Sequence, residues 1–171
     1  FFHSARASAS LPEPLFVLSD LAAVKHSGGL NNDWDLTFTV INLLFSLVEK
    51  STVAQSRDPW TRYRQTMSHC DVKALCGFLT STDEPLKSLL NRQAKLEDEF
   101  IADCYKGDVG SGNIIKQIFQ EIYLGPALFN STYQMEPEIY RDEGYILRER
   151  LLLDRPILEE ISRANVLAIA T

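Results

Sequence analysis

The sequence lacks a hydrophobic run long enough to cross a membrane. Its richest apolar segment, FTVINLLFSLV, is interrupted by Thr39, Asn42 and Ser46, whereas a membrane-spanning helix needs about 18 or more consecutive apolar residues. The first ten residues, FFHSARASAS, also lack the basic start and the apolar stretch of a signal peptide. We therefore expect a cytoplasmic protein that makes no membrane contact.

Cysteine and clustered positive charge are also scarce. The three cysteines, Cys70, Cys76 and Cys104, show no paired spacing, which favours a reducing compartment over a disulfide framework. A tetrahedral zinc site usually takes its ligands from close Cys or His pairs, so His69, Cys70 and Cys76 do not compose one. The formal net charge is −6, and no basic stripe typical of nucleic-acid binding is present. We expect no metal ligands in this chain and no nucleic-acid partner.

Helical periodicity dominates what the sequence does contain. Hydrophobic residues make up 45% of the chain, enough for the core of one domain. Apolar residues recur at intervals of three and four in several segments, which predicts amphipathic helices. The charged run KLEDEF is interpreted as a solvated helix face. The first expected helices are 19–27 with Ser19 as cap, 33–50 capped by Asn31 or Asn32, 59 onward with Asp58 and Pro59, and 72–79 after a capping box at 68–71. The later ones are one long helix at 81–107, 111–125 ended by Gly125, and 155–165 capped by Asp154.

The pattern changes after Asp142. A short extended stretch leads into the last predicted helix, and VLAIAT at 166–171 is typical of a buried strand of a parallel sheet. The predicted fold is therefore mainly α. Residues 1–143 form a helical domain, and residues 144–171 provide a return segment, a helix and one strand of an α/β core that is otherwise absent.

Two stretches resemble a known family. GGLNNDWDLT at 28–37 and GYILRERLLLDRPILEEISRANVLAIAT at 144–171 together resemble the haloacid-dehalogenase-like phosphatases whose helical cap is inserted after the first core strand. FQEIYLG at 119–125 also resembles a helix end in one subgroup of these proteins. The resemblance implies that the chain is the helical cap domain plus the edge of the core. Since the first residue is Phe1 rather than Met, we expect the chain to begin inside a longer protein.

The resemblance also implies a chemistry for the parent protein. The family comprises magnesium-dependent phosphatases that act on small phosphorylated metabolites through a phospho-aspartyl intermediate. Thr171 matches the Ser or Thr that binds the substrate phosphate at the end of its strand. The nucleophile is the first Asp of an Asp-x-Asp motif after an apolar strand, and no such motif is present, because DWD at 33–35 lacks the preceding apolar run. The acidic magnesium ligands would follow Thr171. We expect no catalytic residue in this chain and no hydrolysis by it alone.

The segment NNDWD offers two interpretations. Asn32, Asp33, Trp34 and Asp35 could form a substrate-specificity loop, with Trp34 as an apolar wall. They could instead cap a helix, with Trp34 packed in the core.

Two further alternatives stay open. Arg141, Arg148 and Arg150 could meet a phosphorylated substrate, or they could pair with Glu143 and Glu149 on the surface. The whole chain could also be a non-catalytic helical interaction module that docks a partner on an apolar helix face.

Overall fold

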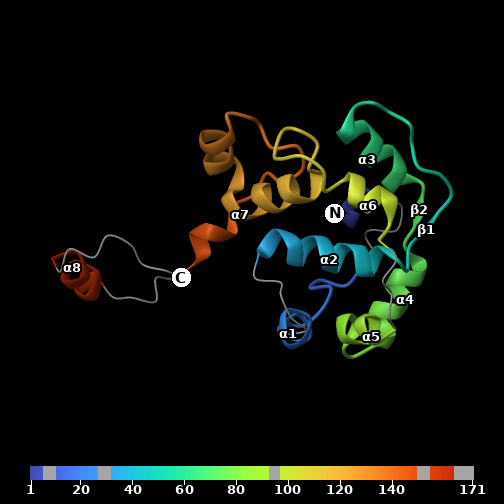
Figure 1. Cartoon of the computed structure of the whole chain (residues 1–171), viewed down its shortest axis with the longest axis horizontal. Helices are drawn as coiled ribbons and strands as arrows, with labels where there is room; N and C mark the ends of the chain where they lie inside the picture. The colour runs from blue at the N-terminus through green and yellow to red at the C-terminus, as the bar shows by residue number, and fades with distance from the viewer. Residues whose placement is uncertain (6–10, 27–31, 93–96, 150–154, 164–171) are drawn as a thin grey trace.

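The computed structural model of the chain is built almost entirely from α-helices (Figure 1). It describes residues 1–5, 11–26, 32–92, 97–149 and 155–163. Within these ranges the predicted mainly α fold class is confirmed. The elements in chain order are η1 (Phe2–Ser4), α1 (Leu18–His26), α2 (Asp33–Phe45), β1 (Glu49–Lys50), α3 (Pro59–Ser68), β2 (Cys70–Asp71), α4 (Lys73–Ser81), α5 (Pro85–Asn91), α6 (Glu99–Asp103), α7 (Ile114–Tyr133), η3 (Tyr145–Arg148) and α8 (Arg155–Arg163).

Helix α2 lies at the centre of the domain. Helices α1 and α5 lie on one side of it, and α6 and α7 pack on the other (Figure 1). The strands β1 and β2 pair antiparallel, with Glu49 opposite Asp71 and Lys50 opposite Cys70. No helix in the described ranges is long and apolar enough to cross a bilayer. The largest fully buried side chains come from α2 to α7 and include Leu44, Tyr63, Met67, Leu75, Leu86, Leu89, Phe100, Ile101, Ile114, Ile115 and Phe129.

Predicted caps at two helix starts are confirmed. The Asn32 side chain accepts a hydrogen bond from the backbone N–H of Trp34 at 2.9 Å and so begins α2. The Asp58 carboxylate accepts the N–H of Thr61 at 2.6 Å, and Pro59 occupies the first turn of α3. Side-chain acceptors at these positions satisfy N–H groups that the first turn of a helix leaves without a partner.

The prediction of one long helix at 81–107 is wrong. The structure contains two separate helices there, α5 and α6. The Asp98 carboxylate accepts the N–H groups of Phe100 and Ile101 at 2.9 and 3.3 Å and starts α6. The Asp98 N–H itself donates to the side chain of Asn42 on α2 at 3.1 Å. Asp98 is therefore a helix cap in a charged run that the sequence interpretation assigned to a solvated helix face.

Two predicted caps are also wrong. Ser68 belongs to the last turn of α3, so no capping box forms; α4 starts instead at Lys73, whose N–H donates to the Asp71 carboxylate at 2.9 Å. Helix α1 begins at Leu18, so Ser19 lies inside it rather than before it. Both errors follow from reading a polar residue next to a helix as its cap, although short side chains of this kind also occur within first and last turns.

Helix α7 changes direction at Gly125, where the sequence predicted an end. Gly125 has φ 71° and ψ 169°, and Pro126 begins the second part of the helix. A Cβ on Gly125 would lie 2.5 Å from the backbone nitrogen of Gly144, and a Cβ on Gly144 would lie 2.3 Å from the carbonyl of Leu124. The returning chain thus crosses α7 backbone against backbone, which only glycine permits at both positions.

The described residues include only part of the segment for which a helix and a strand are predicted at the C-terminus. Helix α8 occupies Arg155–Arg163, as expected after Asp154, and Figure 1 shows it apart from the helical domain. The predicted strand at 166–171, including Thr171, lies outside the described residues. The division into a domain at 1–143 and an α/β edge at 144–171 stays a prediction.

Candidate functional site

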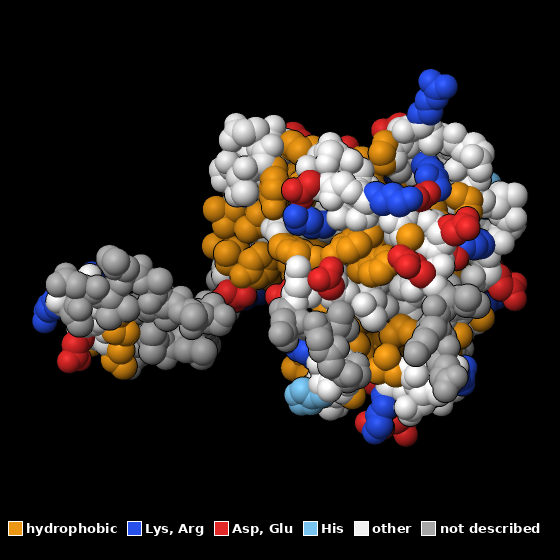
Figure 2. Space-filling model, in the orientation of Figure 1, with side chains coloured by type: hydrophobic (Ala, Val, Ile, Leu, Met, Phe, Trp, Pro, Cys, Tyr) orange, Lys and Arg blue, Asp and Glu red, His pale blue; other side chains and the backbone are white. Residues whose placement is uncertain are grey.

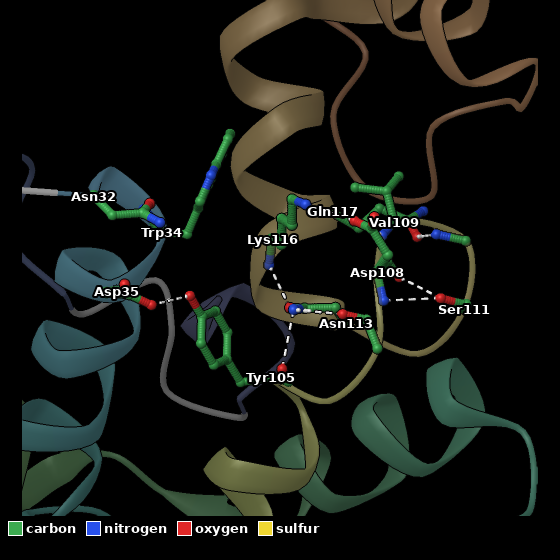
Figure 3. A network of polar contacts seen from close by, with 12 residues as sticks. Asn32, Trp34, Asp35, Tyr105, Asp108, Val109, Ser111, Asn113, Lys116 and Gln117 are labelled. Carbon is green, nitrogen blue, oxygen red and sulfur yellow. Dashed lines mark hydrogen bonds and ion pairs between the residues drawn. The ribbon is translucent and has the colours of Figure 1, made fainter.

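The described part of NNDWD, residues 32–35, lies at the start of α2 and faces α7 (Figure 3). The half-buried Trp34 ring meets the ring of Phe119 edge to face, with 4.8 Å between the centroids. The ammonium of Lys116 lies 5.5 Å from the centroid of the Trp34 ring. Edge-to-face pairs and cation–π contacts at these distances are favourable. Trp34 therefore joins α2 to α7 from the outside of the core rather than from within it.

Asp35 is engaged by the fold. Its carboxylate accepts the hydroxyl of Tyr105 at 2.6 Å (Figure 3), and the Tyr105 ring stacks on Phe38 with 4.6 Å between centroids. Burial, followed by this hydrogen bond, raises the pKa of Tyr105. Asp33 is exposed, and its nearest cation is Lys25 at 3.8 Å. The capping interpretation is thus right for Asn32, and Asp35 has a structural partner in Tyr105. A contact of Asp33 and Trp34 with a substrate stays a prediction.

The loop before α7 fixes Lys116. Asn113 caps α7 by accepting the N–H of Lys116 at 2.9 Å, and the Lys116 ammonium donates to the Asp108 carboxylate at 2.6 Å. The hydrogen bond from Lys116 and then that from the Val109 N–H lower the pKa of Asp108. Lys116 is consequently held between Asp108 and the Trp34 ring.

A hollow of about 570 Å³ opens between α7 and η3 and is called the α7–η3 hollow below. Hydrophobic side chains gather on the side of the molecule where α7 lies (Figure 2). The volume falls in the range of about 300–1,000 Å³ that small-molecule sites occupy. The hollow begins directly beside the Trp34 contact, because Phe119 belongs to both. Its lining residues are Phe119, Ile122, Tyr123, Tyr145, Arg148 and Glu149.

Charged groups stand at the edge of this hollow. The Arg148 guanidinium lies 4.7 Å from the centroid of the Tyr145 ring and 4.0 Å from the carboxylate of Glu143. Burial raises the pKa of Tyr123, and its hydrogen bond to Glu149 adds to the shift. Long ion pairs between exposed groups contribute about 0–1 kcal/mol. Arg148 is therefore only weakly held by Glu143.

Of the three arginines considered from the sequence, Arg148 alone lines the hollow among the described residues. Arg141 lies 3.9 Å from Glu136, with both side chains exposed, which is ordinary surface pairing. Arg150 lies outside the described residues. Arg148 pairs with Glu143, as one alternative had it, and Glu149 bonds to Tyr123.

One residue that holds the hollow together was missed by sequence reasoning. Glu121 on α7 is fully buried, and its carboxylate accepts the backbone N–H groups of Glu138, Ile139 and Tyr140 at 2.8, 2.8 and 3.2 Å. The Gln117 side chain donates a fourth hydrogen bond at 2.9 Å. Glu121 follows Ile114 and Ile118 at helical spacing, so it lies on the same buried face of α7. An acidic residue on a buried face was the feature of the sequence that could have identified it. The carboxylate secures the chain that leads into η3.

The remaining polar candidates do not converge on a site. The ring of His69 contacts the carbonyl oxygen of Gln65 at 2.7 Å, and the buried thiol of Cys70 donates to the carbonyl of Thr66 at 3.3 Å. In the described part of the chain, no group of three or more His, Cys, Asp or Glu side chains is placed to hold a metal ion. These residues have structural partners in α3.

No family model, curated protein or solved structure matches this chain.

Proposed function

We propose that this chain is the helical cap, with the return into the catalytic core, of a magnesium-dependent phosphatase of the haloacid-dehalogenase-like superfamily. The proposal starts from the resemblance of 28–37 and 144–171 to that family. One structural observation supports it. Trp34 and Tyr145 belong to different stretches and lie far apart in the sequence, but Trp34 contacts Phe119, and Tyr145 lines the hollow together with Phe119.

This meeting point matters because a cap acts where its segments converge over a substrate. A cap excludes water from the reacting phosphate and shapes the pocket for the rest of the substrate. The α7–η3 hollow has the size and the mostly apolar lining that such a pocket needs, with few polar groups to orient a ligand. Under this proposal, the hollow faces the core of the parent enzyme.

The chemical step belongs to the core. By the resemblance, an Asp carboxylate of the core would attack the phosphorus atom and expel the alcohol of the substrate, and water would then cleave the acyl phosphate to release inorganic phosphate. A magnesium ion held by the core would neutralise charge on the phosphate. No residue of this chain is assigned to the nucleophile or to the metal. Thr171 would donate its hydroxyl to a phosphate oxygen of the substrate, at the carboxyl end of the predicted strand.

The test compares this chain with a longer product of the same reading frame. We expect an apolar strand with Asp-x-Asp upstream of Phe1 and a Gly-rich turn after Thr171. The longer product should hydrolyse 4-nitrophenyl phosphate with magnesium, and changing the first Asp of that motif to Asn should abolish turnover. The 171-residue chain alone should be inactive. A reading frame without the Asp-x-Asp motif would refute the proposal.

A second candidate function has its own support. Two apolar side chains of η3, which borders the hollow, are exposed, at 52% for Tyr145 and 62% for Leu147. Exposed apolar groups gathered in one place are typical of protein-binding surfaces, so a non-catalytic module that docks the apolar face of a partner helix is the alternative. It predicts that no longer product of the reading frame hydrolyses a phosphate ester.

A further inference from the structure

We propose that the α7–η3 hollow binds a neutral planar heteroaromatic ring. Together with the proposed function, on which this extension rests, the substrate of the parent enzyme is then a phosphate monoester that carries such a ring. The ring site itself is argued from the hollow alone.

The first argument is the lining. Phe119, Tyr123 and Tyr145 supply three aromatic rings, and the first two lie 6.1 Å apart between centroids with 31° between their planes. Aromatic rings prefer offset or edge contacts with centroids about 4.5–7 Å apart. The guanidinium of Arg148, itself planar, already lies against the Tyr145 ring. A flat ligand can make the same kind of contact with these faces.

The second argument is the pair of charged groups at the edge. Arg148 carries only hydrogen-bond donors, and the ionised carboxylate of Glu149 carries only acceptors. A hydrocarbon ring offers no hydrogen bond to the Arg148 donors or to the lone pairs that Glu149 retains beside its bond to Tyr123. A ring with one N–H and one acceptor nitrogen satisfies both. The two charges are opposite, so they favour a neutral ring over a charged one.

The third argument is rigidity. The Glu121 carboxylate fixes the chain at 138–140, and the backbone contact of Gly125 with Gly144 fixes the crossing just before η3. A site whose walls are held before the ligand arrives loses less conformational freedom on binding. The hollow is therefore formed by contacts that do not depend on a ligand.

The structure offers a built-in reporter. Trp34 contacts Phe119, a wall of the hollow, whereas the other tryptophan, Trp60, packs on Tyr63 in α3. The experiment titrates the 171-residue chain with benzimidazole, which carries one ring N–H and one acceptor nitrogen, and with indene, a hydrocarbon of the same shape. Binding is followed by tryptophan emission excited at 295 nm and by calorimetry. We expect saturable binding of one benzimidazole per chain, at least tenfold tighter than that of indene.

Variants locate the ligand. Tyr145→Leu should weaken benzimidazole binding at least tenfold, and Arg148→Met should remove the preference over indene. Glu149→Gln should reduce that preference as well. The control is Tyr133→Leu. Tyr133 lies on α7 beyond Gly125, with its ring against Phe129, so this variant should leave benzimidazole binding unchanged. Since Tyr145 and Arg148 are exposed, these variants should fold, which circular dichroism checks.

Three outcomes would overturn the ring site: no saturable binding, equal affinity for indene, or unchanged affinity in Tyr145→Leu. A fourth outcome that would overturn the ring site involves helix α8, in which Ile157 is 44% exposed. If Ile157→Asp tightened benzimidazole binding tenfold, the hollow would be the docking place of α8 instead. Neither probe carries phosphate, so failure of the ring site leaves the phosphatase proposal standing. A reading frame without the nucleophile, combined with benzimidazole binding, would remove the phosphatase proposal and keep the ring site.

Discussion

Replacing Glu121 by glutamine tests how the α7–η3 hollow is held together. The buried carboxylate accepts four hydrogen bonds, two on each oxygen: Gln117 and Glu138 donate to Oε1, and Ile139 and Tyr140 donate to Oε2. Glutamine has nearly the same shape but carries an NH₂ group in place of one oxygen. In either orientation of the amide, two of the four N–H groups that donate to Glu121 would point at the NH₂ group instead of at an oxygen.

The expected loss of stability follows from these contacts. A hydrogen bond to a charged group contributes about 1.5–3 kcal/mol, and a buried donor without a partner costs about 1–3 kcal/mol. Two lost bonds therefore predict a decrease of roughly 3–6 kcal/mol in the free energy of unfolding. That is a large share of the ~5–15 kcal/mol that holds a typical domain together.

The assay is urea unfolding followed by far-ultraviolet circular dichroism. The matched control is Glu138→Gln, because the Glu138 side chain makes an exposed ion pair with Arg64, and such pairs contribute about 0–1 kcal/mol. Glu121→Gln should also lose benzimidazole binding, since the chain at 138–140 is freed from α7. A decrease below about 1 kcal/mol for Glu121→Gln, equal to the control, would refute this account of the hollow.

Gly125→Ala should lower the free energy of unfolding by about 2–4 kcal/mol in urea, because the φ of 71° at Gly125 and its contact with the returning backbone exclude a Cβ. The control is Gly77→Ala in α4, where an added Cβ would contact nothing within 4 Å; it should stabilise the chain by about 0.5–1 kcal/mol. Asp35→Asn should cost about 1–2 kcal/mol through the Tyr105 bond and the helix dipole, against about 0.3–1 for Asp33→Asn; equal losses would contradict this. Burial raises the pKa of Cys104 from 9.0 to about 12. The Cys104 thiol therefore ionises at a lower pH in the unfolded chain than in the folded one, and the free energy of unfolding should decrease as the pH rises from 9 toward 12. In Cys104→Ala this decrease should be smaller.

The local parts of the fold could be predicted from the sequence. The starts of α2 and α3 follow from Asn32, Asp58 and Pro59, because a cap acts on N–H groups only two or three residues away. The interruption of α7 at Gly125 follows from the conformation that glycine alone adopts readily. Signals of this kind are contained within one turn of the chain.

The parts that depend on distant residues could not be predicted. Asp98 begins α6 in a position where its own N–H bonds to Asn42 on α2, a contact between residues far apart in the sequence. The same residue could equally have belonged to one continuous helix judged by periodicity alone. The α7–η3 hollow likewise needs the crossing of Gly125 and Gly144, and neither glycine by itself indicates the other.

The charged groups of this domain divide by what they do for the fold, and the division favours the hollow as the functional region. Asp35 and Glu121 are engaged by short hydrogen bonds within the domain. The ion pairs that Arg148 and Asp33 make with described residues are long and exposed, at 4.0 and 3.8 Å, and such pairs add little stability. Of the two, Arg148 lines the α7–η3 hollow. Groups that the fold does not need, placed beside an apolar hollow, remain available to contact a ligand.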